Sequence, residues 1–152
     1  MTTIKITTTI NTPIKTVFNN CRNIDLHIKS VSKTNEKAIS GRTSGLIKKG
    51  ETVTWKGKHF GIYLSHQSII SEMKYPHYFI DEQLKGKFKN FKHRHLFKKV
   101  NNSVLMIDEL EYEVPYGIIG KIFNQLFIKK HLTNFIIERN KYLKSISENE
   151  QQ

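Results

Sequence analysis

The chain has 152 residues, which fits one domain and leaves little room for two. Its hydrophobic content of 38% and aromatic content of 11% suffice for a packed core and exclude a disordered chain. The net charge of +12 favours anionic partners without identifying one, and the abundance of Lys, Ile and Asn assigns part of that charge to composition. One cysteine, Cys21, excludes an internal disulfide framework and a cysteine-cluster metal site, and its apolar surroundings favour a buried thiol.

The N-terminal stretch predicts one strand followed by two short helices. "TIKITTTI" (3–10) alternates as a strand does, and it lacks the apolar run of a signal peptide. Thr12 and Pro13 mark a helix start, and apolar residues at helical spacing follow as far as Cys21. Asn23 is the cap candidate of the second helix. Since no stretch approaches a transmembrane span, a cytoplasmic protein is expected.

The middle of the chain predicts a run of antiparallel strands. Short segments punctuated by glycine lead to a longer strand that ends at Pro76, and "YFIDEQLKG" is the next strand. "FKNFKHRHLFKK" (88–99) and "SVLMIDELEYEVP" (103–115) form a pair joined by a hairpin turn at Asn101 and Asn102.

The last part of the chain predicts one long helix from Gly117 to about Ile146. Apolar and small side chains at helical spacing indicate one buried stripe, which includes Ile122, Leu126, Thr133 and Ile137. We therefore expect a single α+β domain over residues 1–146, with six to seven curved antiparallel strands and this helix on their open face. The polar residues 147–152 are expected to fray.

The strand 88–99 has two different faces. Phe91, His93, His95 and Phe97 alternate with Asn90, Lys92, Arg94, Leu96 and Lys98. The aromatic and imidazole set is predicted to face inward, because the opposite register would bury three charges. On the neighbouring strands the pattern does not choose between the two faces of "YFIDEQ", and it favours Asp108 on the inner side only weakly.

A family resemblance covers nearly the whole chain. "FIDEQLKGKFKNFKHRHLF" resembles the F-x-D-x-Q…H-x-H-x-F stretch of a small bacterial subgroup of the SRPBCC superfamily, which includes START domains and proteins of the birch-pollen allergen type. "VTWKGKHFG", "DELEYEVPYGIIGKIFNQLF" and "FIIERNKYLK" are similar to other parts of the same group. The resemblance implies a helix-grip fold with an apolar cavity between sheet and helix. It also implies an inward direction for Phe79, Asp81, Phe91, His93, His95, Phe97, Asp108 and Tyr112. Subgroup members often carry Trp at the position of Phe91, so an indole donor is missing here.

Three interpretations of the two inner histidines remain open. With Asp81 or Asp108 they could bind a metal, act as acid and base on a carbonyl compound, or form a buried network that includes Gln83. No spacing matches an established metal motif, so no metal and no cofactor is predicted. The candidate ligand-binding residues are Trp55, Phe79, Asp81, Gln83, Phe91, His93, His95, Phe97, Met106, Asp108, Tyr112, Ile122 and Leu126, and the candidate catalytic residues are His93, His95 and Asp108.

The sequence predicts a domain that binds, and carries or senses, a small hydrophobic or amphipathic molecule such as a lipid or polyketide-like compound. One alternative is a cyclase or dehydratase that uses His93, His95 and Asp108. The other is a basic module that docks on RNA, ribosome or anionic membrane. Nucleic acid is disfavoured because the aromatic side chains face away from the bases, whereas the apolar and then basic segment "YGIIGKIFNQLFIKK" favours a weak membrane contact. The oligomeric state is left open.

Overall fold

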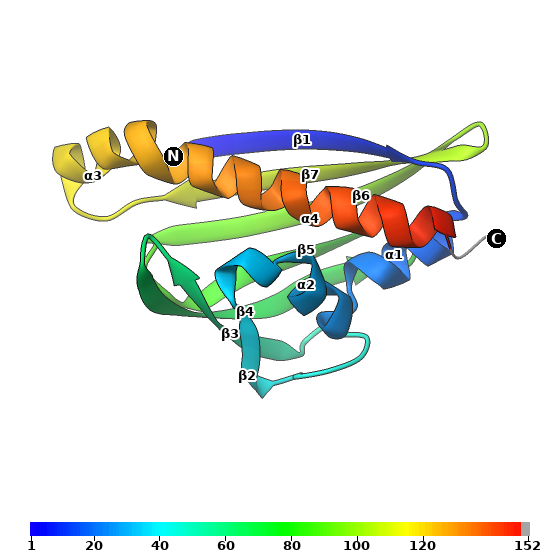
Figure 1. The fold of residues 1–152 in the computed structure, drawn as a ribbon, viewed down its shortest axis with the longest axis horizontal. Coiled ribbons are helices and arrows are strands. Elements are labelled where there is room, and N and C mark those ends of the chain that lie inside the picture. Colours follow the sequence, from blue (N-terminus) through cyan, green and yellow to red (C-terminus); the bar gives the residue numbers. More distant parts are fainter. Residues whose placement is uncertain (150–152) are drawn as a thin grey trace.

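A seven-stranded antiparallel sheet forms the body of the protein in the computed structural model, which describes residues 1–149 (Figure 1). The strands lie in the order β1-β7-β6-β5-β4-β3-β2. Their bounds are β1 (Thr2–Ile10), β2 (Lys37–Gly41), β3 (Thr52–His59), β4 (Ile62–Lys74), β5 (Tyr78–Lys85), β6 (Asn90–Val100) and β7 (Ser103–Glu113). The predicted α+β class and the number of strands are confirmed.

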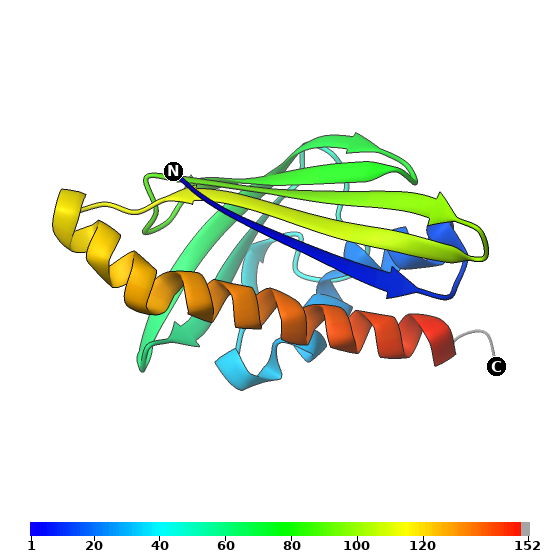
Figure 2. The ribbon, with the colours of Figure 1, turned by 90° about the horizontal axis from the view of Figure 1, so that it is seen from above.

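A long C-terminal helix runs along the concave face of the sheet, which is the helix-grip arrangement. It comprises α3 (Gly117–Phe123), a π-helical turn η2 (Asn124–Ile128) and α4 (Lys129–Asn149), which follow one another without a break. Two short helices, α1 (Ile14–Cys21) and α2 (Ile24–Ser30), and a 3-10 turn η1 (Ser32–Thr34) lie beside it. Figure 2 shows α3 projecting beyond the ends of the strands.

Local sequence signals explain several of these boundaries. The Asn23 side chain accepts hydrogen bonds from the backbone N–H groups of Asp25 and Leu26, which makes it the predicted N-cap of α2. Asn101 adopts a left-handed backbone conformation with φ of 54°, as the β6–β7 hairpin turn requires. Both predictions are confirmed.

The C-terminal helix does not end where the polar composition predicts. It continues through Ser147 to Asn149, because Ser147 is fully buried against the start of the chain. The Asn20 Nδ2 donates to Ser147 Oγ at 3.1 Å, and Thr12 Oγ1 donates to the Ser147 carbonyl at 3.0 Å. These contacts hold the last turn in place, and residues 150–152 of the predicted tail lie outside the described part of the chain.

The buried stripe predicted for this helix is wrong in its first half. Ile122 and Leu126 are exposed, whereas Gly120 and Asn124 face the protein. Further along, the buried positions are Ile136, Arg139, Asn140, Leu143 and Ser147. The π turn between the two halves adds a residue to one turn, so the apolar periodicity before it does not continue in phase with the periodicity after it.

The outer face of β6 is paired with acids rather than freely solvated. Lys92 Nζ lies 2.8 Å from Glu82 Oε1 on β5, and Arg94 Nη1 lies 2.9 Å from Glu111 Oε1 on β7. The sequence run of bases around these residues contains no acid, but neighbouring strands supply them across the sheet. The predicted inner and outer sets are confirmed, yet the outer face is not a uniformly basic surface.

Candidate functional site

A layer of polar side chains, all buried except the partly exposed Asp81, crosses the middle of the concave face. Asp81 comes from β5, His93 and His95 from β6, and Asp108 from β7, while Arg139 reaches the layer from α4. The register places His93 beside Asp81, and His95 beside Asp108, on adjacent strands. Strand alternation therefore gathers four predicted site residues, and the long helix adds a fifth residue, the charged Arg139.

Asp108 is the centre of this layer and has no exposed surface. Its Oδ1 lies 2.8 Å from His93 Nε2, 3.0 Å from His95 Nδ1 and 3.4 Å from Arg139 Nη1, and Asn140 Nδ2 donates to Oδ2 at 2.7 Å. Burial acts to raise the pKa of Asp108, but the hydrogen bonds from the two histidines and the charge of Arg139 lower it well below its usual range. Asp108 is consequently a fixed carboxylate and not a proton donor.

His95 lies between two carboxylates. Its Nδ1 faces Asp108, and its Nε2 lies 2.9 Å from Asp81 Oδ2. Burial opposes the charged ring, but the negative potential of the Cys21 sulfur and the hydrogen bonds to both carboxylates raise the pKa of His95 well above its ordinary value. An imidazolium with both nitrogens donating has no free lone pair, so His95 is a structural cation rather than a base.

His93 differs from its neighbour because only one of its nitrogens is used. Nε2 lies 2.8 Å from Asp108, and Nδ1 has no hydrogen bond to a described residue. Burial and the adjacent charge of His95 lower the pKa of His93, which favours the neutral ring. His93 and Asp108 thus form a carboxylate–imidazole pair with one unused ring nitrogen.

Arg139 and Cys21 complete the layer, and the sequence pattern did not indicate their contacts. Arg139 is buried although it is charged, and it donates from Nη2 to Cys21 Sγ at 2.8 Å. Cys21 is buried as predicted, but its sulfur contacts polar groups and also lies 3.7 Å from His95 Nδ1. The available signal was helical spacing, because Arg139 lies three residues after Ile136 and four before Leu143 on the buried stripe.

The polar layer also contains the only group of possible metal ligands that the described residues form. Single donor atoms of Asp81, His93 and His95 lie within 4.8 Å of one another. A metal ion there would have to replace the proton between His95 Nε2 and Asp81 Oδ2, and both nitrogens of His95 already contact carboxylates. The arrangement is satisfied as a hydrogen-bonded network, so no metal is assigned to it.

A second chain of histidines lies at the rim of the concave face and was missed in the sequence. The buried carboxylate of Glu36 contacts His27 Nε2 at 2.6 Å and His59 Nε2 at 3.7 Å, and His59 Nδ1 lies 2.9 Å from His131 Nε2. Burial acts to raise the pKa of Glu36, but the two imidazoles lower it to about 2. These four residues come from α2, the segment before β2, β3 and α4, so only the tertiary fold brings them together.

Solvent reaches part of the concave face although the strands there are central in the sheet. The side chain of Asp81 on β5 is 20% exposed, and His66, Gln83 and Phe91 on β4, β5 and β6 are half-buried. These strands have neighbours on both edges, so this exposure does not arise at a free edge of the sheet. Gln83 and Phe91 also line a depression at the strand ends. Trp55 on β3 is half-buried on the same side and contacts His27, with ring centroids 4.4 Å apart.

The other predicted site residues lie in three different surroundings. Phe79, Phe97 and Met106 belong to the packed core around α1, where Phe18 contacts both phenylalanine rings. Tyr112 is fully buried, and its hydroxyl donates to Asn124 Oδ1 at 2.6 Å. Ile122 and Leu126, as described above, lie on the outer side of the helix. Only Trp55, Asp81, Gln83, Phe91 and, at its edge, His93 line the accessible part.

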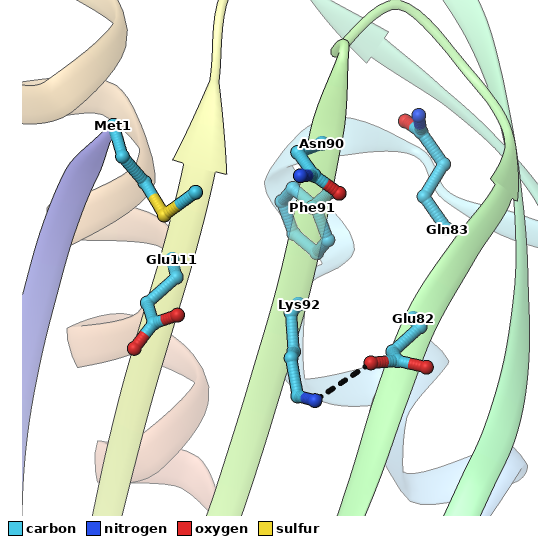
Figure 3. Close-up of a pocket in the computed structure, with 7 residues that line it drawn as sticks. All are labelled: Met1, Glu82, Gln83, Asn90, Phe91, Lys92 and Glu111. Carbon is cyan, nitrogen blue, oxygen red and sulfur yellow. Dashed lines mark ion pairs between the residues drawn. The ribbon is translucent and has the colours of Figure 1, made fainter.

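A depression of about 240 Å³ opens near the ends of β5, β6 and β7, and two predicted site residues, Gln83 and Phe91, contribute to its lining. Figure 3 shows its lining, in which Glu82 and Lys92 form an ion pair across the strands and Met1 and Glu111 close the other side. Its volume is below the range of roughly 300 Å³ and more that is typical of small-molecule sites. The charged lining makes it a poor match for an apolar ligand.

Solved structures share this fold over nearly their whole length. TTHA0849 from Thermus thermophilus is 11% identical, covers 96% of this chain and 99% of its own, and has a TM-score of 0.75. A START superfamily protein from Mycobacterium smegmatis is 12% identical, with 97% of each chain covered and a TM-score of 0.73. Ginseng major latex-like protein 151 from Panax ginseng is 12% identical, covers 96% of this chain and 97% of its own, and has a TM-score of 0.65. No family model and no curated protein sequence matches the chain. The similarity shows that this chain and these structures share the helix-grip fold.

Proposed function

We propose that the protein binds a small apolar or amphipathic molecule on the accessible part of its concave face. The observation that carries this proposal is the partial exposure of Trp55, Asp81 and Phe91 on the inner side of central strands. A ligand there would contact aromatic walls while polar groups at the bottom fix its orientation, as is usual in small-molecule sites. Burial of its apolar surface would contribute about 25 cal/mol per Å².

The polar groups at the bottom favour a neutral ligand head with a hydrogen-bond donor. Asp81 uses Oδ2 for His95, and its Oδ1 has no hydrogen bond to a described residue. The pKa of Asp81 is lowered despite its burial, because His95 and His93 stabilise the carboxylate. Gln83 Oε1 is buried beside the His66 ring and is not offered to a ligand. The carboxylate of Asp81 suits a hydroxyl group and repels a carboxylate.

The test compares dodecanol with dodecanoate, two probes that share their chain length and differ in head group. Trp55 is the sole tryptophan, so its fluorescence reports directly on the wall of the site. The alcohol is expected to bind roughly tenfold more tightly than the anion. Asp81→Asn should reduce this preference, whereas Glu82→Gln, on the opposite face of the same strand, should preserve it. If neither probe alters Trp55 emission and native mass spectrometry detects no bound molecule, the proposal fails.

The unused nitrogen of His93 supports a second candidate, a general base held by Asp108. Such a base could remove a proton from the carbon between two carbonyl groups of a polyketide-like compound. The measurement is deuterium exchange at that carbon of acetylacetone, with His93→Gln expected to abolish any acceleration. Exchange no faster than in buffer would eliminate this candidate and leave the binding proposal intact.

A further inference from the structure

The first helical turns after β7 expose their apolar side chains to solvent, whereas a helix that packs on a core normally buries them. Ile118 and Ile119 are each 77% exposed, and further large side chains of the same segment are largely exposed, namely Tyr116, Ile122, Phe123, Leu126 and Phe127. The positions that face the protein are instead Gly120, Asn124 and the half-buried Ile128. A surface helix of a globular protein normally buries its apolar stripe, so this segment is amphipathic in the reverse sense.

The reversed orientation is built into the contacts beneath the helix. A Cβ at Gly120 would overlap the carbonyl oxygen of Pro115, so only glycine allows this close approach. Asn124 accepts a hydrogen bond from the Tyr112 hydroxyl, and its Nδ2 donates to Thr2 Oγ1 at 2.9 Å. Small and polar groups therefore attach the helix to the sheet, and the apolar side chains are left outward.

The hairpin between β3 and β4 extends this surface. Phe60 and Ile62 are each more than half exposed, and the Phe60 ring contacts Phe123 with centroids 5.8 Å apart. The outward apolar residues of 116–127 together with Phe60 and Ile62 are called the apolar end surface below. It lies at the end of the molecule where α3 projects past the strands (Figure 2), beside the accessible part of the concave face. Contiguous exposed apolar surfaces of this kind mark interaction sites.

The charge around the apolar end surface indicates the partner. Lys121, Lys129 and Lys130 are exposed and form no ion pair with a described residue. No acidic residue occurs in 114–137 or in 52–71, which together contain this surface. Aromatic and aliphatic side chains flanked by unpaired lysines match a bilayer interface with anionic head groups. The described residues include no helix that is long and apolar enough to span a bilayer.

We propose that the apolar end surface docks the protein on an anionic lipid bilayer, with α3 lying in the interface. A second copy of the chain is a poorer partner, because pairing the surface with itself would bring its lysines together on two chains that each carry a charge of +12. The proposal concerns membrane contact and does not depend on the ligand proposed above.

The first test is co-sedimentation with vesicles of phosphatidylcholine alone and of phosphatidylcholine mixed with phosphatidylglycerol. The protein is expected to bind the anionic vesicles and to be released as salt is raised. The combined substitutions Ile118→Ser, Ile119→Ser and Leu126→Ser should weaken binding about tenfold or more. They change exposed side chains, so the fold should be retained. The matched control replaces three exposed apolar residues elsewhere, Ile39→Ser, Leu84→Ser and Val100→Ser.

The second test separates the charge from the apolar contact. Lys121→Glu with Lys130→Glu should abolish the preference for anionic vesicles. Lys98→Glu with Lys99→Glu makes the same change in net charge in β6, close to the β6–β7 hairpin at the other end of the sheet, and should have a smaller effect. The proposal is overturned if the wild-type protein stays unbound or if the apolar variant binds as well as its control. It is also overturned if analytical ultracentrifugation shows a dimer that the apolar variant dissociates.

Discussion

The concave face of the sheet has two halves, and its side chains are more deeply buried in one half than in the other. Under α1 and the end of α4, side chains such as Phe18, Phe97 and Leu143 are buried completely in one apolar cluster. Toward the start of α4, Phe91 and Trp55 are only half-buried. Phe91 packs against a smaller apolar cluster, and Trp55 packs at the edge of the larger one. The polar layer around Asp108 lies between these halves. Close packing in the half under α1 stabilises the fold. The less buried half toward the start of α4 is where we propose that the ligand binds.

The difference arises from what covers each half. α1 packs against β6 and β7 and, with α4, fills one end with aromatic and aliphatic groups. At the other end the long helix continues into α3, whose inward positions are a glycine and an asparagine and contribute little volume. One face of a strand can therefore carry similar aromatic residues at both ends, as β6 carries Phe91 and Phe97, while only one of them is fully buried.

The largest expected effect is the contrast between Phe97→Ala and Phe91→Ala, two residues of one face of β6. Removing the fully buried Phe97 should lower the free energy of unfolding by about 3–5 kcal/mol. Phe91 is half-buried, so its removal should cost clearly less while weakening the response of Trp55 to dodecanol. Denaturant unfolding and the fluorescence titration measure the two effects. Equal losses of stability would show that the halves are packed alike.

The next effect tests whether the polar layer is a structural unit. Asp108→Asn would leave the charges of His95 and Arg139 without their central carboxylate, and we expect a loss of about 3 kcal/mol or more in the free energy of unfolding. The control is Glu109→Gln, the adjacent residue on the outer face, whose exposed pair with Lys5 should contribute at most about 1 kcal/mol. Similar values for both variants would contradict the role of Asp108.

A smaller loss of stability is expected on acidification, and it comes from Glu36 at the rim of the concave face. The pKa of Glu36 in the folded protein is about 2, below the ordinary value of 4.5, so the folded state binds its proton less readily than the unfolded state. Its stabilising contribution, about 3 kcal/mol at most, is present above pH 4.5 and is lost as pH falls toward 2. Glu36→Gln should flatten this part of the pH–stability curve relative to the wild type. An unchanged curve would show that the histidine pair does not stabilise the carboxylate.

Much of the fold follows from local patterns in the chain. The alternation in 88–99 determined which side chains of β6 face inward, because burying its three cations would be costly. Asn23 and the asparagines at 101 and 102 marked a helix start and a hairpin, since their side chains and backbone preferences act over a few residues. These features require no knowledge of distant parts of the chain.

Tertiary structure alone decided how charges are partnered and which apolar surfaces are covered. Arg139 and Cys21 are 118 positions apart and share a hydrogen bond, and Glu36 contacts histidines from two separate elements, α2 and β3. The outward direction of Ile122 and Leu126 depends on the contacts of Gly120 with Pro115 and of Asn124 with Tyr112 and Thr2. A sequence pattern records that a residue is apolar or charged, but the path of the whole chain determines which residues it contacts. That path buries the apolar side chains at one end of this protein and leaves them exposed at the other.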